Sequence, residues 1–202
     1  MDLHPESDSR LRVVLSGVPD DVRWHTPVRS TVKDLRRVHR PQYIRWVQEI
    51  ARGTRFLDSN TYVTCHSFDV ASYAAGSATM AVEEALDGKH SFALVRPPGH
   101  HAGPDQAMGF CIFNNAAVAA AKALESIDKV AIIDWDLHHG NGTQDIFYES
   151  EQVLFCSVHE ENSFPKTGWI DEIGTGAGRG YTLNAPLAAR STIADYTLIF
   201  SE

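Results

Sequence analysis

Two carboxylates and an imidazole recur at every second position in the stretch VAIIDWDLHHGNGTQ. Asp134, Asp136 and His138 follow an aliphatic run, and if that strand continues through them, their side chains project to one side. Carboxylate oxygen and imidazole nitrogen are suitable ligands for Zn²⁺ or a similar divalent ion, and a catalytic site adds a third ligand and an open position for water. The spacing therefore favours a metal site over the alternative, a polar surface loop.

A pair of adjacent histidines, His100 and His101, lies between prolines and glycines in VRPPGHHAGPDQAMGFC. Imidazole titrates near neutral pH, so such a pair can take a proton from water and return it to a leaving group. An isolated pair is more often a loop or capping element. This loop, however, follows the apolar run SFALVRP and is expected at the same sheet edge as Asp136 and His138. The sequence thus predicts a general acid and base beside a metal site.

The elements that must position these residues follow an alternating pattern. The short aliphatic runs SFALVRP, KVAIIDWD and QVLFCSV are typical of strands in a parallel sheet, and helical patterns such as NNAAVAAAKALESI and NGTQDIFYES separate or follow them. Upstream, we expect a helix from Pro41 that stops at Gly53 and an alanine-rich helix from about Ser67 to Leu86. The pattern predicts the α/β class, with three layers, α/β/α, around a mainly parallel sheet.

Composition limits the classes of protein and partner. A chain of 202 residues with 43% apolar content suits a single domain over residues 1–202. The net charge of -8 disfavours nucleic acid and anionic membranes as partners. With no signal peptide and no apolar run long enough for a membrane helix, a cytoplasmic protein is expected. The widely spaced Cys65, Cys111 and Cys156 suggest buried reduced thiols.

Two segments near the C-terminus have less specific patterns. GTGAGRGY does not follow a strand and open a helix, so we interpret it as a flexible connection and not as a nucleotide-binding loop. STIADYTLIFSE predicts a helix capped at Ser191 or Thr192 that reaches the end of the sequence without a stop signal. The chain is therefore expected to end inside an element.

Four motifs together resemble one known family. RPPGHHA, GFCIFNNAAVAA, DWDLHHGNGTQ and the phenylalanine of NSFPKTG are similar to the zinc-dependent histone deacetylases, in the branch of bacterial histone deacetylase-like amidohydrolases and acetylpolyamine amidohydrolases. HPESDSRL and LRRVHRPQYI resemble the N-terminal segments of that family. The resemblance runs from about His4 to about Phe200 and implies the deacetylase fold.

The resemblance implies roles for residues at the reaction centre. Asp136 and His138 match two of the three zinc ligands. His100 and His101 match the tandem acid and base pair, with His101 as the proton shuttle. Asn141 stands where some members have an aspartate beside His101, so a dependence of activity on negative charge there is in doubt for this chain.

Potassium sites are also implied by the resemblance. Asp134 matches a carboxylate that orients His100 and touches a potassium ion, and Ser157 and the carbonyl of Val158 match the rest of that site. A second potassium site would use four carbonyl groups, those of Phe147, Ser150, Val153 and Tyr181.

The substrate site implied by the resemblance is a narrow acyl-lysine tunnel. Phe110 and Phe164 match its two aromatic walls, for which the alternative is an ordinary core phenylalanine. The Gly109 carbonyl matches an acceptor for the substrate amide. Asp58 would hold the substrate backbone at the rim, or else is a solvated loop acid.

One departure from the family pattern concerns completeness. In the family, the third zinc ligand is a later aspartate, followed by a glycine-rich loop and usually a carbonyl-polarising tyrosine, and these would lie beyond residue 202. The chain thus resembles the N-terminal two-thirds of a deacylase that converts acetyl-lysine, or a related acylated amine, to acetate and free amine. The alternatives are an acetylpolyamine amidohydrolase, a noncatalytic acyl-lysine-binding module and an inactive fragment.

Overall fold

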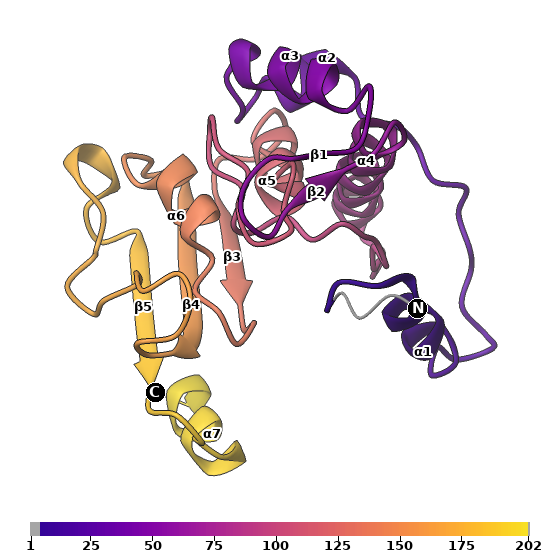
Figure 1. The fold of residues 1–202 in the computed structure, drawn as a ribbon. Coiled ribbons are helices and arrows are strands. Elements are labelled where there is room, and N and C mark those ends of the chain that lie inside the picture. The colour runs from indigo at the N-terminus through magenta and orange to yellow at the C-terminus, as the bar shows by residue number, and fades with distance from the viewer. Residues whose placement is uncertain (1–4, 202) are drawn as a thin grey trace.

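The C-terminal half of the chain forms a three-stranded parallel sheet in the computed structural model, which describes residues 5–201 (Figure 1). Its strands are β3 (Val130–Asp134), β4 (Val153–Glu160) and β5 (Thr182–Leu187), in the order β3-β4-β5. The helix α6 (Asn141–Phe147) connects β3 to β4, as a parallel crossover requires. The prediction of an α/β protein with a parallel sheet is confirmed.

The register of the sheet aligns polar side chains in one row. Asp134 on β3 is the partner of Ser157 on β4, which is the partner of Asn184 on β5. Because side chains alternate between faces, these three residues lie on the same face of the sheet. The opposite face carries Ile133 and Leu183, which are about half exposed (51% and 52%).

Most of the helices precede the sheet in the chain and lie beyond its β3 edge (Figure 1). The long α4 (Ser67–Leu86) packs along α5 (Asn115–Ala123), and both lie beside the short hairpin of β1 (Arg55–Phe56) and β2 (Tyr62–Val63) in Figure 1. The remaining helical elements are α1 (Asp8–Leu15), α2 (Val32–Leu35), α3 (Pro41–Ile50), the 3-10 turn η1 (Gly176–Gly178) and α7 (Ile193–Ser201).

The larger hydrophobic core lies between α2, α3, α4 and the loop that precedes α5. Its fully buried members include Leu35, Val47 and Phe113, and each such side chain contributes roughly 1.5–3 kcal/mol by leaving water. Asn114 begins α5: its Oδ1 accepts a hydrogen bond from the Ala117 N–H at 3.0 Å. The core therefore fixes the loop of residues 98–114, which carries the tandem histidines.

Two strand predictions were wrong. SFALVRP forms no strand among the described residues, because no described strand forms a β-ladder with it and its proline, Pro97, lacks an N–H donor. The strand β3 ends at Asp134 and does not continue to His138. Instead, Asp134 Oδ1 accepts the Asp136 N–H at 3.1 Å, and Asp136 Oδ1 accepts the His138 N–H at 2.8 Å. These side chain to backbone bonds compete with the sheet and turn the chain.

The C-terminal predictions had mixed outcomes. The helix after Thr192 is confirmed, with the Thr192 N–H donating to Asp195 Oδ2 at 2.6 Å. The segment GTGAGRGY leads directly into β5, a strand that the sequence did not predict. Cys111 is buried as expected, whereas Cys65 is exposed. The motif HPESDSRL begins at His4, which lies outside the described residues.

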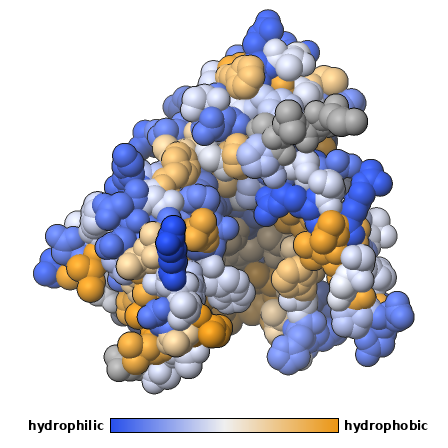
Figure 2. Space-filling model, turned by 60° about the horizontal axis from the view of Figure 1, so that its bottom comes forward, coloured by the Kyte–Doolittle hydropathy of each residue, from blue (hydrophilic) through white to orange (hydrophobic). Residues whose placement is uncertain are grey.

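The lower end of the molecule carries exposed apolar residues. Figure 2 shows this end brought forward, with apolar residues around a hollow and hydrophilic ones at the periphery. Trp135 after β3 and Ile193 and Phe200 on α7 are more than half exposed (69%, 82% and 55%). Within residues 5–201, no helix is both long and apolar enough to cross a membrane.

Candidate active site

The tandem histidines lie on a tight loop that packs against the start of α6. Thr143 donates its backbone N–H to the His100 carbonyl at 3.1 Å, and a Cβ on Gly142 would come within 2.5 Å of the Ala102 carbonyl carbon. This close approach requires glycine at position 142. The ring centroids of His100 and His101 are 4.0 Å apart, so the two imidazole rings pack directly against each other.

His100 is paired with a carboxylate. Its Nδ1 lies 2.9 Å from Asp134 Oδ2, and both side chains are largely buried. Burial alone would lower the pKa of His100, but the hydrogen bond and charge of Asp134 outweigh it and raise the pKa. The pair also lowers the pKa of Asp134, despite burial. His100 is therefore the histidine that retains its proton more readily.

His101 has the opposite environment. Burial, helped by the charge of His100, lowers the pKa of His101 to about 4. Its Nδ1 lies 2.8 Å from Asn141 Oδ1, and the Asn141 amide nitrogen is directed to Met108 Sδ at 3.6 Å. Because an amide oxygen only accepts, Nδ1 of His101 carries the hydrogen and Nε2 keeps its lone pair. His101 is thus a neutral imidazole with a free basic nitrogen.

Asp136 and His138 lie beside the tandem pair. Asp136 Oδ1 is 3.3 Å from His138 Nδ1 and 3.9 Å from His100 Nε2. Two tetrahedral zinc ligands at about 2.1 Å from the ion are about 3.4 Å apart, so the Asp136 and His138 atoms fit two vertices of such a site. Among residues 5–201, no group of three His, Cys, Asp or Glu side chains is arranged to hold a metal. The chain therefore presents a two-ligand pair, and a third ligand is not found in the described part.

Phe164, in the connection between β4 and β5, packs against His101 and His138. Its ring lies edge-to-face with His101 at 5.0 Å and with His138 at 6.0 Å between centroids. Gly109 packs on the same group, because a Cβ there would lie 2.4 Å from His101 Cδ2 and 3.0 Å from Phe164 Cε1. The predicted substrate residues Gly109 and Phe164 are thus brought together with the predicted base.

Phe110 follows Gly109 in the chain and lines a separate pocket. Both Gly109 and Phe110 have positive φ, +55° and +70°, and the Phe110 N–H donates to Thr61 Oγ1 at 2.9 Å. Asp58 Oδ1 accepts the Thr61 N–H at 2.5 Å, so Asp58 holds the β1–β2 turn that contacts Phe110. Its expected contact with a substrate stays a prediction.

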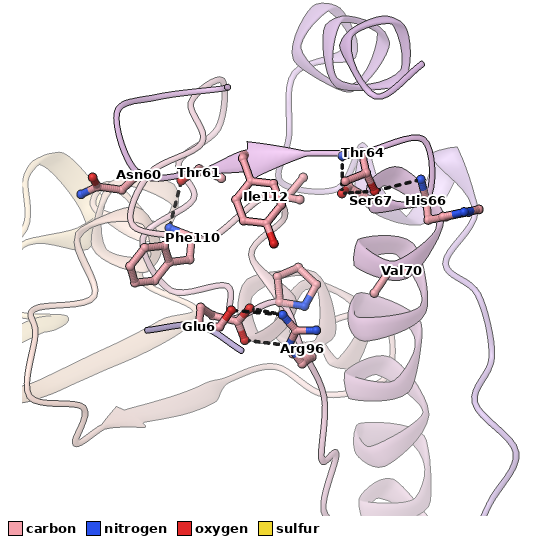
Figure 3. Close-up of a pocket in the computed structure, with 12 residues that line it drawn as sticks. Glu6, Asn60, Thr61, Thr64, His66, Ser67, Val70, Arg96, Phe110 and Ile112 are labelled. Carbon is pink, nitrogen blue, oxygen red and sulfur yellow. Dashed lines mark hydrogen bonds and ion pairs between the residues drawn. The ribbon is translucent and has the colours of Figure 1, made fainter. Parts of the chain in front are cut away.

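The pocket on the far side of Phe110 has a volume of about 190 Å³ (Figure 3). Arg96 and Glu6 form an ion pair there, with Arg96 Nε donating to Glu6 Oε1 at 2.9 Å. The pair connects the segment before α1 to the residues that precede the tandem histidines. Its contribution is positional, since it fixes the start of that loop.

The residues expected at the first potassium site are adjacent in the sheet. Ser157 is fully buried beside Asp134, Val158 follows it, and the Ser157 hydroxyl lies 2.9 Å from His159 Nδ1. At the expected second site, the Phe147 carbonyl accepts the Ser150 N–H at 2.9 Å. The predicted carbonyls of Val153 and Tyr181 lie on β4 and just before β5. Both potassium sites stay predictions.

The sequence-based interpretation missed several polar residues around the site, all of them buried except Glu172, which is partly buried. His39 and Asn114 support the loop from one side, whereas His139, Gln144 and Glu172 lie on the other side. The available signal was weak: His139 and Gln144 belong to DLHHGNGTQ, but single polar residues outside a cluster do not indicate burial.

The comparisons with known proteins agree with this fold. Residues 4–202 match the histone deacetylase domain. A probable deacetylase from Archaeoglobus fulgidus is 35% identical, over 98% of this chain and 58% of that protein. The crystal structure of the HDA15 HD domain superposes with a TM-score of 0.93 and 39% identity, covering 98% of this chain and 60% of that one.

A third comparison is with a solved acetylpolyamine aminohydrolase. The crystal structure of acetylpolyamine aminohydrolase from Burkholderia pseudomallei has a TM-score of 0.84 and 31% identity, over 96% of this chain and 66% of that one. These matches define a class of α/β proteins with the deacetylase fold. The chain belongs to the histone deacetylase family, and it spans 58% and 60% of the lengths of the first two relatives.

Proposed function

We propose that this chain is the tandem-histidine part of a zinc-dependent deacylase, which hydrolyses the amide of acetyl-lysine or a related acylated amine. The observation that carries the proposal is the contrast within the histidine pair. His100 bonds to a carboxylate and His101 to a neutral amide, so only His101 is poised as a base. The Asp136 and His138 pair beside them supplies donors that suit zinc.

Each residue has a defined role in this reaction. A zinc ion held by Asp136, His138 and a third ligand would supply a Lewis acid for the amide carbonyl and for water. His101 Nε2 takes a proton from the water whose oxygen bonds to the carbonyl carbon. As the C–N bond breaks, His101 gives that proton to the leaving nitrogen, and the products are acetate and a free amine.

The neighbouring groups tune and orient the base. Asp134 raises the pKa of His100 and so favours its protonated form; burial, together with that charge 4.0 Å away between ring centroids, lowers the pKa of His101 and favours its neutral form. Asn141 holds the His101 tautomer that leaves Nε2 basic. Phe164, Gly109 and Phe110 form an apolar wall for a short acyl chain. A potassium ion at Asp134, Ser157 and Val158 would brace the same strand ends.

The test combines metal content with turnover. Zinc content and hydrolysis of a fluorogenic acetyl-lysine peptide are measured for the 202-residue chain and for the polypeptide that continues along its reading frame. We expect turnover in the longer polypeptide and its loss in His101→Ala, because no other described base occupies that position. Bound zinc without turnover of either acetyl-lysine or acetylpolyamine would refute the deacylase proposal.

A second candidate function is a noncatalytic module that binds acylated amines. The observation that favours it is the two-ligand pair, which by itself does not complete a catalytic metal site. Such a module would bind an acetyl-lysine peptide without releasing acetate. Acetate release by the longer polypeptide, at a rate above that of His101→Ala, would exclude it.

A further inference from the structure

A network of polar side chains, of which Gln144 and Asn184 are buried and Glu172 is partly buried, connects α6, β5 and the long connection between β4 and β5. Glu172 Oε2 accepts hydrogen bonds from Gln144 Nε2 at 2.6 Å and from the Gly168 N–H at 3.1 Å. Asn184 Nδ2 donates to Gln144 Oε1 at 2.8 Å and to the Glu172 carbonyl at 3.2 Å. Glu172, Gln144 and Gly168 are called the Glu172 clamp below.

The direction of each hydrogen bond follows from the groups involved. A carboxylate only accepts, so Gln144 presents its amide nitrogen to Glu172 and its amide oxygen to Asn184 and His139. His139 Nε2 then donates to Gln144 Oε1 at 3.1 Å, and its Nδ1 accepts from the Thr167 hydroxyl at 2.7 Å. The clamp thus joins the connection to the turn that carries His138, the residue before His139.

Gly168 is the point where the connection approaches the core most closely. Its φ is +84°, and a Cβ there would lie 2.6 Å from ring atoms of both His139 and His159. The His159 Nε2–H donates to the Gly168 carbonyl at 3.0 Å, while the Gly168 N–H is taken by Glu172. Both polar groups of this peptide position are therefore satisfied, and the backbone at Gly168 is fixed.

Phe164 lies four residues before this fixed point. Its side chain is 41% exposed, so its own burial contributes little to holding the ring against His101. A side chain that is not fixed by packing takes its position from the backbone that carries it. On the C-terminal side of Phe164, the backbone is held at Gly168, whose N–H donates to the Glu172 carboxylate in the Glu172 clamp.

We propose that Glu172 is a positioning residue: through the Glu172 clamp it holds Phe164 edge-to-face on His101 and so fixes one wall of the acyl site. The part of this inference that concerns the acyl site rests on the proposed deacylase function. The position of the Phe164 ring, in contrast, is a property of the chain that is measurable without turnover.

The experiment measures ring contacts by NMR. Nuclear Overhauser effects between the rings of Phe164 and His101 are recorded in the full chain for Glu172→Ala and Glu172→Gln. The matched control is Glu161→Ala, which removes the same charge from an exposed position of the same connection. Thermal unfolding of every variant separates a displaced ring from a lost fold.

We expect the Phe164 to His101 contacts to be lost in Glu172→Ala and retained in Glu161→Ala. Glu172→Gln keeps an oxygen for the Gly168 N–H and should restore them. If Glu172→Ala does not fold, Glu172→Asp takes its place, because the shorter side chain cannot reach both donors. Wild-type contacts in a folded Glu172→Ala or Glu172→Asp protein, or an equal loss in Glu161→Ala, would overturn the proposal.

Turnover provides the second readout, in the longer polypeptide that the function test uses. There Glu172→Ala should lower kcat/KM by about 10- to 100-fold, mainly through KM, as expected when a substrate wall shifts by about 1 Å. An inactive wild-type protein contradicts the deacylase function alone, and the NMR contacts still decide whether Glu172 positions Phe164. Wild-type kcat/KM in Glu172→Ala would overturn the positioning role in catalysis.

Discussion

His39 should make the fold sensitive to mild acid. The side chain is only 2% exposed, and both ring nitrogens are used: Nδ1 donates to the Gly103 carbonyl at 2.9 Å, and Nε2 accepts the Asn114 N–H at 2.9 Å. Protonation at Nε2 would replace the second hydrogen bond by a contact between two donors. Burial lowers the pKa of His39 to about 4, although carbonyl groups nearby oppose this.

The size of the effect follows from linkage between protonation and folding. The pKa of His39 falls from 6.5 in the unfolded chain to about 4 in the folded one, and each unit corresponds to about 1.4 kcal/mol. Above pH 6.5 both states are neutral and nothing is lost. As the pH falls from 6.5 to 4, the unfolded state binds the proton first, so folding loses about 3 kcal/mol.

The assay compares urea unfolding of the wild type and His39→Gln between pH 7 and pH 4. At pH 7 the variant should be less stable by about 1–3 kcal/mol, because the fit of the buried hydrogen bonds is lost. Its unfolding free energy should then fall less steeply with acid than that of the wild type. The difference isolates His39 from the buried His101 and His139, whose pKa values are also lowered to about 4.

His90→Gln is the control, since His90 is exposed. It should leave both the stability at pH 7 and the pH dependence as in the wild type. If His39→Gln and the wild type lose stability in parallel between pH 6.5 and 4, His39 is not the acid-sensitive group and the reasoning fails.

Three further predictions concern the loop and its neighbours. Asn141→Asp should raise the pKa of His101 from about 4 toward neutrality, because a carboxylate replaces the amide 2.8 Å from Nδ1; an unchanged NMR titration of His101 would contradict this. Gly109→Ala should destabilise the fold by about 1–2 kcal/mol through its positive φ and displace the His101 ring, which unfolding and ring shifts would detect; wild-type values of both would refute it. Asn114→Ala should cost about 2–4 kcal/mol in urea unfolding, since the helix cap and the hydrogen bond to Thr143 Oγ1 at 3.0 Å are both lost, and a cost below 1 kcal/mol would refute it.

The sequence predicted the elements whose patterns are local. The helix α4 has the predicted bounds, Ser67–Leu86, and α3 begins at Pro41 as expected. Alternating aliphatic runs and alanine-rich helices indicated the parallel sheet. In the structure, β3 and β4 lie at the aliphatic runs, and a crossover helix connects them. These features depend on residue type and spacing alone, so they are readable without coordinates.

Features that depend on distant partners could not be read in this way. β5 includes Pro186 and follows a glycine-rich segment, and only its pairing with β4 makes it a strand. Conversely, SFALVRP has the composition of a strand but finds no partner in residues 5–201. Asp136 and His138 were expected to continue the strand of Asp134, but the carboxylates of Asp134 and Asp136 bond to backbone N–H groups and turn the chain.

The candidate site also combines features that are local in the sequence with features that depend on distant partners. Adjacent histidines are visible in the sequence, but the opposite shifts of their pKa values are not: Asp134, 34 positions away in the chain, raises that of His100, whereas burial and the charge of His100 lower that of His101. The resemblance to a family supplied the pairings of the two histidines with Asp134 and Asn141 before the geometry did. Glu172 had no such signal, because its partners are an amide side chain and a backbone N–H.

The two faces of the sheet should differ in how well they tolerate mutation. On β3, β4 and β5, Asp134, Ser157 and Asn184 are packed among other side chains, whereas Ile133 and Leu183 point to solvent. A scan of all single substitutions would therefore show a period of two along these strands, with polar replacements accepted at every other position. The alternation should break at the end of β4, where residues 157–159 are buried in succession.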